Sequence, residues 1–251
     1  MKVFLTGASS GIGEALARHY AARGATLGLF ARRADLLRTL KDSLPAPAET
    51  YAGDVRDIAA LKSAAGDFIA RHGVPDLVIG NAGVSYGTLT EIAEDAATFR
   101  EILDVNVVGL VNTFHPFIEP MRARARGRLA GIASVAGIRG LPGSSGYSAS
   151  KAAAISYLEG LRLELRRSGV KVSTICPGFI KTPMTAKNPY PMPFILEAGD
   201  AALRIARALD AGRTYAIVPW QMAIVGSVLR VLPNSVYDRM LSGMGRKPRK
   251  R

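Results

Sequence analysis

Residues 6–13 read TGASSGIG, and this stretch decides the fold. It follows a short apolar run with strand character, VFLT (3–6), and precedes a helical pattern over 14–23. Its three glycines allow positive φ or the close approach of another backbone. The helix that follows points its free N-terminal amides over the turn, where they and the helix dipole favour an anion such as a diphosphate. Strand, glycine-rich turn and helix in this order predict a dinucleotide site at the start of an α/β sheet.

The alternation of strands and helices continues outward from this turn. Further runs with strand character lie at 25–30, 49–54, 76–80, 128–134, 170–176 and 214–218. Helical patterns lie at 14–23, from about 34, and at 57–72, 98–121, 147–168 and 199–210. Such alternation implies parallel strand pairing through right-handed crossovers, with helices on both faces. The prediction is an α/β, doubly wound, three-layer sandwich around a mostly parallel seven-stranded sheet. No repeat or Pro/Gly linker divides the chain, so we expect residues 1–251 to form a single domain.

The net charge of +13 is concentrated in two places. Four arginines lie in 122–128 and five basic residues lie among the last nine, with no acid in either stretch. A solvated, mobile tail is the expectation, and contact with an anionic membrane is the alternative. Because no aromatic residues are interleaved with these charges, we expect no nucleic-acid partner.

The remaining composition points to a reducing compartment. One cysteine, Cys176, excludes an internal disulfide and is expected to be a small buried residue. His19, His72 and His115 are too scattered to hold a metal, and none is expected. No signal peptide is expected before the first strand, and no apolar run is long enough to span a bilayer. The expected location is cytoplasmic, with peripheral attachment to the inner face of a membrane as the alternative.

The end of the second expected strand carries two arginines instead of the acid that usually binds a cofactor ribose. Arg32 and Arg33 occupy this place, and the first acid after them is Asp35. Positive charge at a helix N-terminus opposes the helix dipole, whereas a ribose 2′-phosphate would be bound well by guanidinium groups. This predicts NADP(H) in preference to NAD(H). A solvated basic pair is the alternative.

Further motifs make the chain resemble the short-chain dehydrogenase/reductase (SDR) family over roughly residues 2–220. The motifs are TGASSGIG (6–13), GDV (53–55), GNAG (80–83), DVNVVG (104–109), Ser134, YSASK (147–151) and PGFIKT (177–182). The resemblance implies a Rossmann-type fold and a homodimer or homotetramer formed through the two long helices expected at 98–121 and 147–168. The sequence departs from the family at Gly80, where a second asparagine is common.

Four residues are the expected catalytic group. A phenol donates a proton readily near neutrality, and Tyr147 and Lys151 share a helix face because they are four residues apart. The lysine ammonium, together with an oxidised nicotinamide, should lower the pKa of Tyr147. Ser134 can hydrogen-bond the substrate oxygen. By resemblance, Lys151 also binds the nicotinamide ribose, and Asn106 holds a water in the proton relay.

The glycine turn, the arginine pair and the family resemblance together give the expected cofactor contacts. By resemblance, GDV lies at the adenine, GNAG at the adenosine ribose and PGFIKT at the nicotinamide. The expected residues are Thr6, Gly7, Ser9, Ser10, Gly11, Ile12, Gly13, Arg32, Arg33, Asp54, Val55, Asn81, Ala82, Gly83, Tyr147, Lys151, Pro177, Gly178, Ile180 and Thr182.

Two segments are expected to set the substrate and the partners. By resemblance, 183–200 is the substrate-loop region, and its apolar run MTAKNPYPMPFIL (184–196) favours a hydrophobic substrate. The alternative is a lid that is apolar only because it covers the site. Residues 219–251 form a helical extension with a basic tail, in which Val236, Met240 and Leu241 share one side of a short helix. The extension packs on a partner subunit or lies on an anionic membrane.

The predicted function is an NADP(H)-dependent oxidoreductase that interconverts a carbonyl and a secondary alcohol. The alternative is a cofactor-binding sensor or scaffold on the same fold. Such a protein would not need the four catalytic residues, and their joint presence favours the enzyme.

Overall fold

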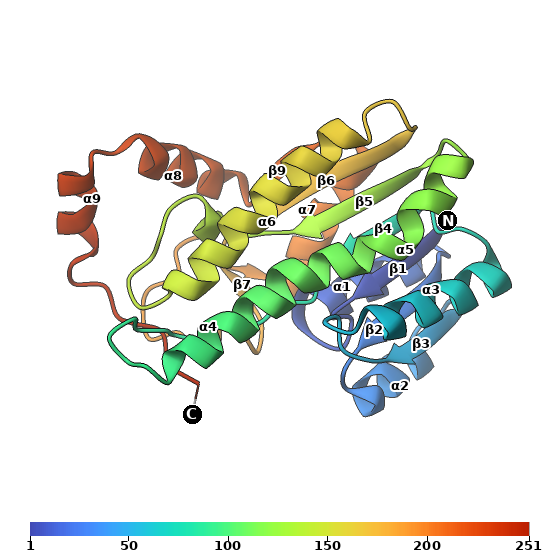
Figure 1. Ribbon diagram of the computed structural model, residues 1–251, viewed down its shortest axis with the longest axis horizontal. Helices are drawn as coiled ribbons and strands as arrows, with labels where there is room; N and C mark the ends of the chain where they lie inside the picture. The colour runs from blue at the N-terminus through green and yellow to red at the C-terminus, as the bar shows by residue number, and fades with distance from the viewer. Residues whose placement is uncertain (251) are drawn as a thin grey trace.

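Seven strands form one sheet in which every neighbouring pair is parallel (Figure 1). The computed structural model describes residues 1–250. The strand order is β3-β2-β1-β4-β5-β6-β9. The strands are β1 (Lys2–Thr6), β2 (Thr26–Ala31), β3 (Ala48–Ala52), β4 (Leu77–Gly80), β5 (Gly127–Ile132), β6 (Val170–Pro177) and β9 (Tyr215–Val218). The predicted seven-stranded parallel sheet is confirmed.

Helices cover both faces of this sheet because the strands alternate their side chains between two cores. Val3 and Leu5 of β1 join one core, whereas Phe4 between them joins the other. The first core also receives apolar residues from α1 (Gly11–Ala22), α2 (Ala34–Asp42) and α7 (Ala198–Asp210). The second receives them from α3 (Ile58–His72), α5 (Gly109–Ala123) and α6 (Ser145–Glu164). The result is the predicted three-layer arrangement.

The helix expected over 98–121 is interrupted. α4 (Asp95–Leu103) passes through a π-helical turn, Asp104–Val108, before α5 begins. A π turn inserts one extra residue into the helical ladder, and such turns occur frequently at functional sites. This turn contains Asn106. The amphipathic pattern could not show it, because apolar periodicity continues on both sides.

The C-terminal extension begins with two helices, as expected. They are α8 (Trp220–Val231) and α9 (Asn234–Leu241). Tyr237 is the buried residue of α9, and its hydroxyl donates to the carbonyl of Gly140. Val236 and Met240 remain exposed.

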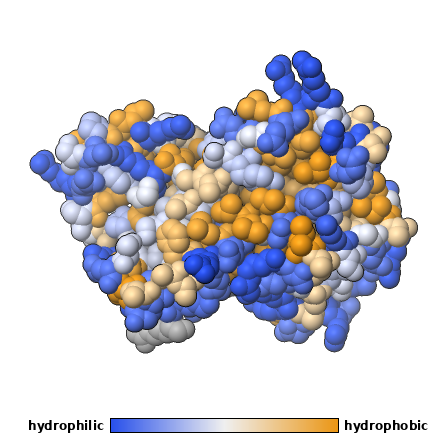
Figure 2. Space-filling view, viewed as in Figure 1, coloured by the Kyte–Doolittle hydropathy of each residue, from blue (hydrophilic) through white to orange (hydrophobic). Residues whose placement is uncertain are grey.

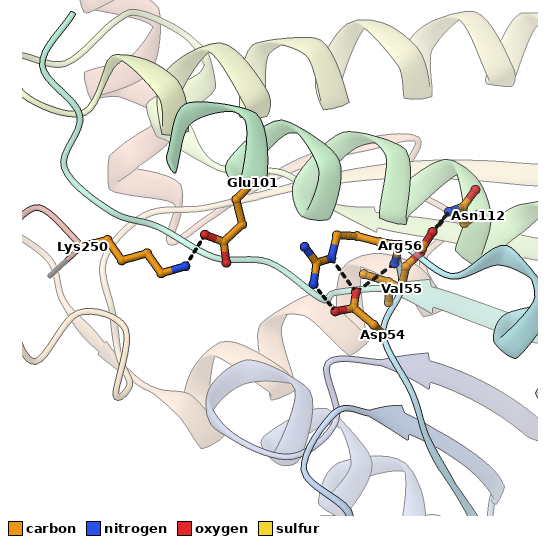
Figure 3. A network of polar contacts seen from close by, with 6 residues as sticks. All are labelled: Asp54, Val55, Arg56, Glu101, Asn112 and Lys250. Atoms are coloured by element: carbon orange, nitrogen blue, oxygen red, sulfur yellow. Dashed lines mark hydrogen bonds and ion pairs between the residues drawn. The ribbon is translucent and has the colours of Figure 1, made fainter. Parts of the chain in front are cut away.

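The basic tail is docked, so the expectation of a freely solvated tail is wrong for residues 247–250. The tail runs from α9 to the loop before α4 (Figure 1). Arg249 pairs with Asp95 of α4. Lys250 pairs with Glu101 of the same helix (Figure 3). The tail's own residues gave no sign of this docking, because the two acids that bind it lie more than 140 residues earlier in the sequence.

Two simpler findings complete the fold. Cys176 is fully buried, as expected, with its Sγ 3.4 Å from the Tyr215 hydroxyl. Among residues 1–250, no helix combines the length and apolar character needed to cross a membrane.

Candidate active site

The glycine-rich turn connects β1 to α1 and leaves room for a ligand. Gly7 and Gly11 have φ of +68° and +60°, a region that favours glycine. A Cβ on Gly7 would lie 2.7 Å from Cα of Ala82, and one on Gly13 would overlap the Gly7 carbonyl oxygen. Ser10 precedes α1 without capping it through its side chain. The first amides of α1 therefore stay available to an anion such as a diphosphate.

Asn81 ties this turn to the neighbouring strand. Its Nδ2 donates to the carbonyls of Thr6 and Gly7, both at 3.2 Å. The contact lies where β1 meets β4, the point at which strand order reverses and dinucleotides bind in such sheets. A Cβ on Gly80 would overlap Cδ1 of Leu110. The departure from the family pattern at Gly80 thus allows α5 to pack closely on β4, and Asn81 still makes the connection.

The arginine pair lies beside the same turn. Arg33 Nη2 donates to the hydroxyls of Ser9 at 3.0 Å and Ser10 at 2.7 Å, and Arg32 lines the adjoining cleft. Both arginines are exposed. Neither forms an ion pair with an acid among residues 1–250 under a 4.0 Å limit, so their charge is available to a ligand.

Asp54 and Val55 are held by residues that the sequence reasoning missed. Arg56 donates from Nε and Nη2 to the Asp54 carboxylate, which holds the pKa of Asp54 below its usual range (Figure 3). Asn112 of α5 donates from Nδ2 to the Val55 carbonyl at 3.0 Å. A buried asparagine on an otherwise apolar helix face was the available signal for this contact.

Ser134, Tyr147 and Lys151 converge at the other end of the cleft. Ser134 follows β5, and its hydroxyl accepts from Ala136 N at 3.1 Å. Tyr147 lies in the first turn of α6. Lys151, one helical turn later, lies with Nζ 5.8 Å from the centroid of the Tyr147 ring and donates to the Ile132 carbonyl at 2.8 Å. The phenol, the ammonium and the serine hydroxyl therefore share one pocket.

Burial dominates the acid–base properties of this group. It raises the pKa of Tyr147 to about 12, and the Ser134 hydroxyl opposes part of the shift. It lowers the pKa of Lys151 to about 8. The expected lowering of the Tyr147 pKa is not seen in the chain alone. Burial outweighs any stabilisation of the phenolate, and the Lys151 ammonium is bonded to a backbone carbonyl. Near neutrality the phenol is protonated and ready to donate.

Asn106 holds the site together from the π turn. Its Oδ1 accepts from Val84 N at 2.8 Å, and its Nδ2 donates to Val84 O at 3.0 Å and to Ser150 Oγ at 2.9 Å. Ser150 in turn donates to the Tyr147 carbonyl at 2.7 Å. Both amide hydrogens of Asn106 are thus committed. Asn106 can offer a water only an acceptor, either the second lone pair of Oδ1 or its main-chain carbonyl.

A cleft of about 240 Å³ joins these parts. All but three of the expected site residues line it; the exceptions are Thr6, Gly13 and Asn106. These three support the lining residues through the contacts of β1, the turn and the π segment. Three further lining residues, Pro183, Met184 and Thr185, belong to the expected substrate-loop region. Six lining residues were not among the expected contacts and lie within or beside the quoted motifs. They are Ala31, Gly53, Val84, Val105, Ile132 and Ala133.

Comparison with known proteins agrees with this geometry. The family described as short chain dehydrogenase matches residues 1–191. An uncharacterized oxidoreductase of Myxococcus xanthus is 39% identical, and the match covers 93% of each chain. An 11-beta-hydroxysteroid dehydrogenase-like protein of Arabidopsis thaliana is 33% identical over 93% of this chain and 78% of its own.

A solved structure gives the same result for the fold. The alcohol dehydrogenase of Thermococcus sibiricus complexed with 5-hydroxy-NADP is 27% identical with a TM-score of 0.76, over 87% of this chain and 96% of its own. The fold, the cleft and these matches lead to one conclusion: the chain belongs to the short-chain dehydrogenase/reductase family of oxidoreductases.

Proposed function

We propose that the chain is an NADP(H)-dependent oxidoreductase that interconverts a hydrophobic carbonyl compound and its secondary alcohol. The observation that carries the proposal is the shared cleft, in which the Tyr147–Lys151 pair and Ser134 face the same space as the glycine-rich turn. The glycine-rich turn fits a dinucleotide because its backbone can approach a ligand closely. Gly7 is required for this geometry, since a Cβ there would collide with the backbone of Ala82. The alternative, a sensor without turnover, gives no reason for a protonated phenol beside a desolvated ammonium.

The chain's own residues account for the proton. A bound nicotinamide supplies the hydride to the carbonyl carbon, or accepts it in the reverse direction. The Ser134 hydroxyl orients the substrate oxygen towards Tyr147, and the Tyr147 phenol donates its proton to that oxygen. In the reverse direction Tyr147 accepts the proton. The Lys151 ammonium, 5.8 Å from the ring centroid, stabilises the phenolate left behind.

The preference for NADP(H) rests on Arg32 and Arg33. Arg33 already bonds two hydroxyls of the glycine-rich turn, and Arg32 lines the cleft beside it. A 2′-phosphate at the end of β2 would meet two guanidinium groups, which bind phosphate through paired charge-assisted hydrogen bonds. The Thermococcus sibiricus structure contains an NADP derivative, which supports the same preference.

Titration of Arg33→Ala with both cofactors tests this preference. We expect the Kd for NADPH to rise about tenfold to a hundredfold, the equivalent of one or two charge-assisted hydrogen bonds, with little change for NADH. Arg38→Ala, an exposed arginine of α2, is the matched control and should leave both values unchanged. Equal or tighter binding of NADH by the unaltered chain would contradict the assignment.

The substrate side of the cleft favours an apolar compound. Pro183 and Met184 line the cleft beside Ile180. The ring of Phe179, the residue before Ile180, has its centroid 6.4 Å from that of Tyr190 in the substrate loop. The Arabidopsis relative is named for its likeness to a hydroxysteroid dehydrogenase, and a hydroxysteroid is a hydrophobic alcohol. An NADPH-oxidation screen across aryl ketones, steroid ketones, aldehydes and sugars tests this proposal. Turnover confined to the sugars would contradict the hydrophobic assignment, and cofactor binding without turnover would favour the sensor.

We also infer a homodimer or homotetramer. Val108, Val111 and Leu163 are 46%, 37% and 58% exposed on the π turn, α5 and α6. Apolar side chains gather along the middle of the face that carries these helices (Figure 2). Light scattering that gives a monomer mass at micromolar concentration would contradict this inference.

A further inference from the structure

The C-terminal tail lies across the loops that surround Tyr147. The Pro248 carbonyl accepts from Gly87 N at 2.8 Å, in the loop between β4 and α4. Gly143, just before α6, lies against Arg246, because a Cβ there would approach the Arg246 side chain to 2.8 Å. Gly245 lies beside Pro189 of the substrate loop. The tail thus contacts three loops on the substrate side of the cleft.

A buried acid fixes the tail in this position. Arg249 Nε donates to both carboxylate oxygens of Asp95, at 3.0 and 2.8 Å. Asp95 is only 4% exposed and also accepts from Leu89 N at 2.8 Å. Lys250 pairs with Glu101, six residues after Asp95 in α4, and lies over the ring of Tyr86, 5.3 Å from its centroid. Contacts made before Pro248, at Gly245 and Arg246, and after it, at Arg249 and Lys250, therefore hold the tail in place.

This anchoring brings Lys247 next to the catalytic tyrosine. Lys247 Nζ is 5.7 Å from the centroid of the Tyr147 ring, almost the same as the 5.8 Å of Lys151. It donates to Ser85 Oγ at 2.8 Å. Among residues 1–250 it forms no ion pair within 4.0 Å, and burial lowers its pKa to about 8. One neutral hydroxyl satisfies one of its three N–H groups.

We propose that Lys247 binds an anionic group of the substrate, a carboxylate or a phosphate, positioned next to the carbonyl that Tyr147 protonates. The inference rests on the proposed function and narrows its substrate class to hydrophobic carbonyl compounds that carry a negative charge. Arg249 and Asp95 act as positioning residues, because they deliver Lys247 without touching the substrate.

The physical reason is the unbalanced charge of the ammonium. A partly buried cation without a counter-ion loses hydration that one hydroxyl does not replace. Lys151, the other cation at this ring, has a backbone carbonyl and a role towards the phenolate. Lys247 has neither. An anion of the substrate would restore the missing partner through a charge-assisted hydrogen bond, and it would do so only for substrates that carry one.

Matched pairs of acid and ester test the proposal. Benzoylformate and 3-benzoylpropionate are to be compared with their methyl esters in NADPH oxidation, and dihydroxyacetone phosphate with dihydroxyacetone. We expect the acid to exceed its ester about tenfold or more in kcat/KM, mainly through KM, as one charge-assisted hydrogen bond allows. The benzoyl and phosphate arms distinguish a carboxylate from a phosphate as the bound group. Equal efficiency for every pair would overturn the proposal.

Variants assign the preference to Lys247. Lys247→Met should bring the acid-to-ester ratio close to one, and Lys247→Arg should retain most of it. Arg249→Met should lower the ratio as well, because the tail loses its anchor. Lys171→Met, an exposed lysine of β6, is the matched control and should keep the ratio of the unaltered chain. A ratio that Lys247→Met leaves intact would overturn the proposal.

A binding measurement separates this inference from the proposed function. Calorimetry on the NADP⁺-bound chain should show that benzoylformate binds more tightly than its methyl ester. Lys247→Met should raise the Kd for benzoylformate about tenfold. If no carbonyl compound is turned over but this difference is found, the proposed function fails and the anion site at Lys247 stands. If the esters are reduced and the acids neither bind nor react better, the inference fails and the proposed function stands.

Discussion

The two ends of the cleft are built in different ways. At the cofactor end, the glycine-rich turn, the end of β2 and Asn81 lie on rigid strand ends, and their contacts are local or between neighbouring strands. At the substrate end, part of the wall comes from the substrate loop, and a tail whose partners lie about 150 residues earlier in the chain packs beside Tyr147. Tyr147 belongs to both ends, since it lines the cleft and lies beneath Lys247.

This difference teaches which part of the function is fixed by the fold. Cofactor binding needs short backbone distances that only a few residue types allow, so the same short motif specifies both the turn and its ligand. Substrate selection depends on side chains carried by loops and by the tail, which can change without disturbing the sheet. Variants at the two ends should therefore fail in different ways.

The largest effect is expected at the residue that the two ends share. Tyr147→Phe removes the proton donor and leaves the ring that packs beside Lys151 and Lys247. We expect kcat for carbonyl reduction to fall about a thousandfold, within the range of general acid catalysis, with the Kd for NADPH changed less than threefold or so. Single-turnover kinetics with a fluorescence titration of NADPH provides the measurement. A variant that keeps most of its turnover would remove Tyr147 from the mechanism.

Sequence reasoning succeeded where the physics is local. The turn at 6–13 and the seven parallel strands follow from patterns within short windows. The roles of the four residues of the expected catalytic group stay a prediction. The structure brings Ser134, Tyr147 and Lys151 into one cleft, with Asn106 bonded behind them.

Sequence reasoning failed where one segment meets another over a long distance. The tail has the composition of a solvated segment, and nothing in its own residues reveals Asp95 and Glu101 as partners. The π turn at Asp104–Val108 is hidden for a similar reason, since its extra residue is accommodated by contacts with Val84 and Ser150. The pKa of Tyr147 depends on burial, which no spacing of residues reports.

The second effect is expected at the cofactor end. In Gly13→Ala, the new methyl group would overlap the Gly7 carbonyl and approach Asn81 Nδ2. The turn must shift, so we expect the free energy of unfolding to fall by about 2 kcal/mol, as for other overpacked sites, and NADPH binding to weaken. Denaturant unfolding and cofactor titration measure both.

Gly66→Ala is the matched control for that substitution. Gly66 is an exposed residue inside α3, and a Cβ there meets nothing within 4 Å. It should stabilise the chain by about 0.5–1 kcal/mol, because alanine favours the helix, and it should leave cofactor binding unchanged. If both variants behave alike, the close approach at Gly13 does not matter and the contrast between the two ends is lost.

The smallest effect on overall stability, and the sharpest test of the substrate end, is expected at Asp95. Its bonds from Arg249 and from Leu89 N hold the pKa of the Asp95 carboxyl below its usual range. Because the folded value is depressed, the contact stabilises the docked tail above the ordinary carboxyl pKa of about 4 and loses strength as pH falls through the lower folded value. Asp95→Asn should weaken the contact between residue 95 and Arg249 at any pH. At pH 7.5 we expect trypsin to cleave after Arg246 roughly tenfold faster in this variant, since cleavage follows the population of the open form. Asp238→Asn, an exposed acid of α9, is the control.

Amide exchange of the tail in the unaltered chain should stay slow from pH 7 to about pH 4, once corrected for the intrinsic rate, and rise only below it. Equal cleavage of both variants would mean that the Gly87–Pro248 contact alone holds the tail. The substrate end would then resemble the cofactor end, built on backbone geometry and not on a distant pair of charges.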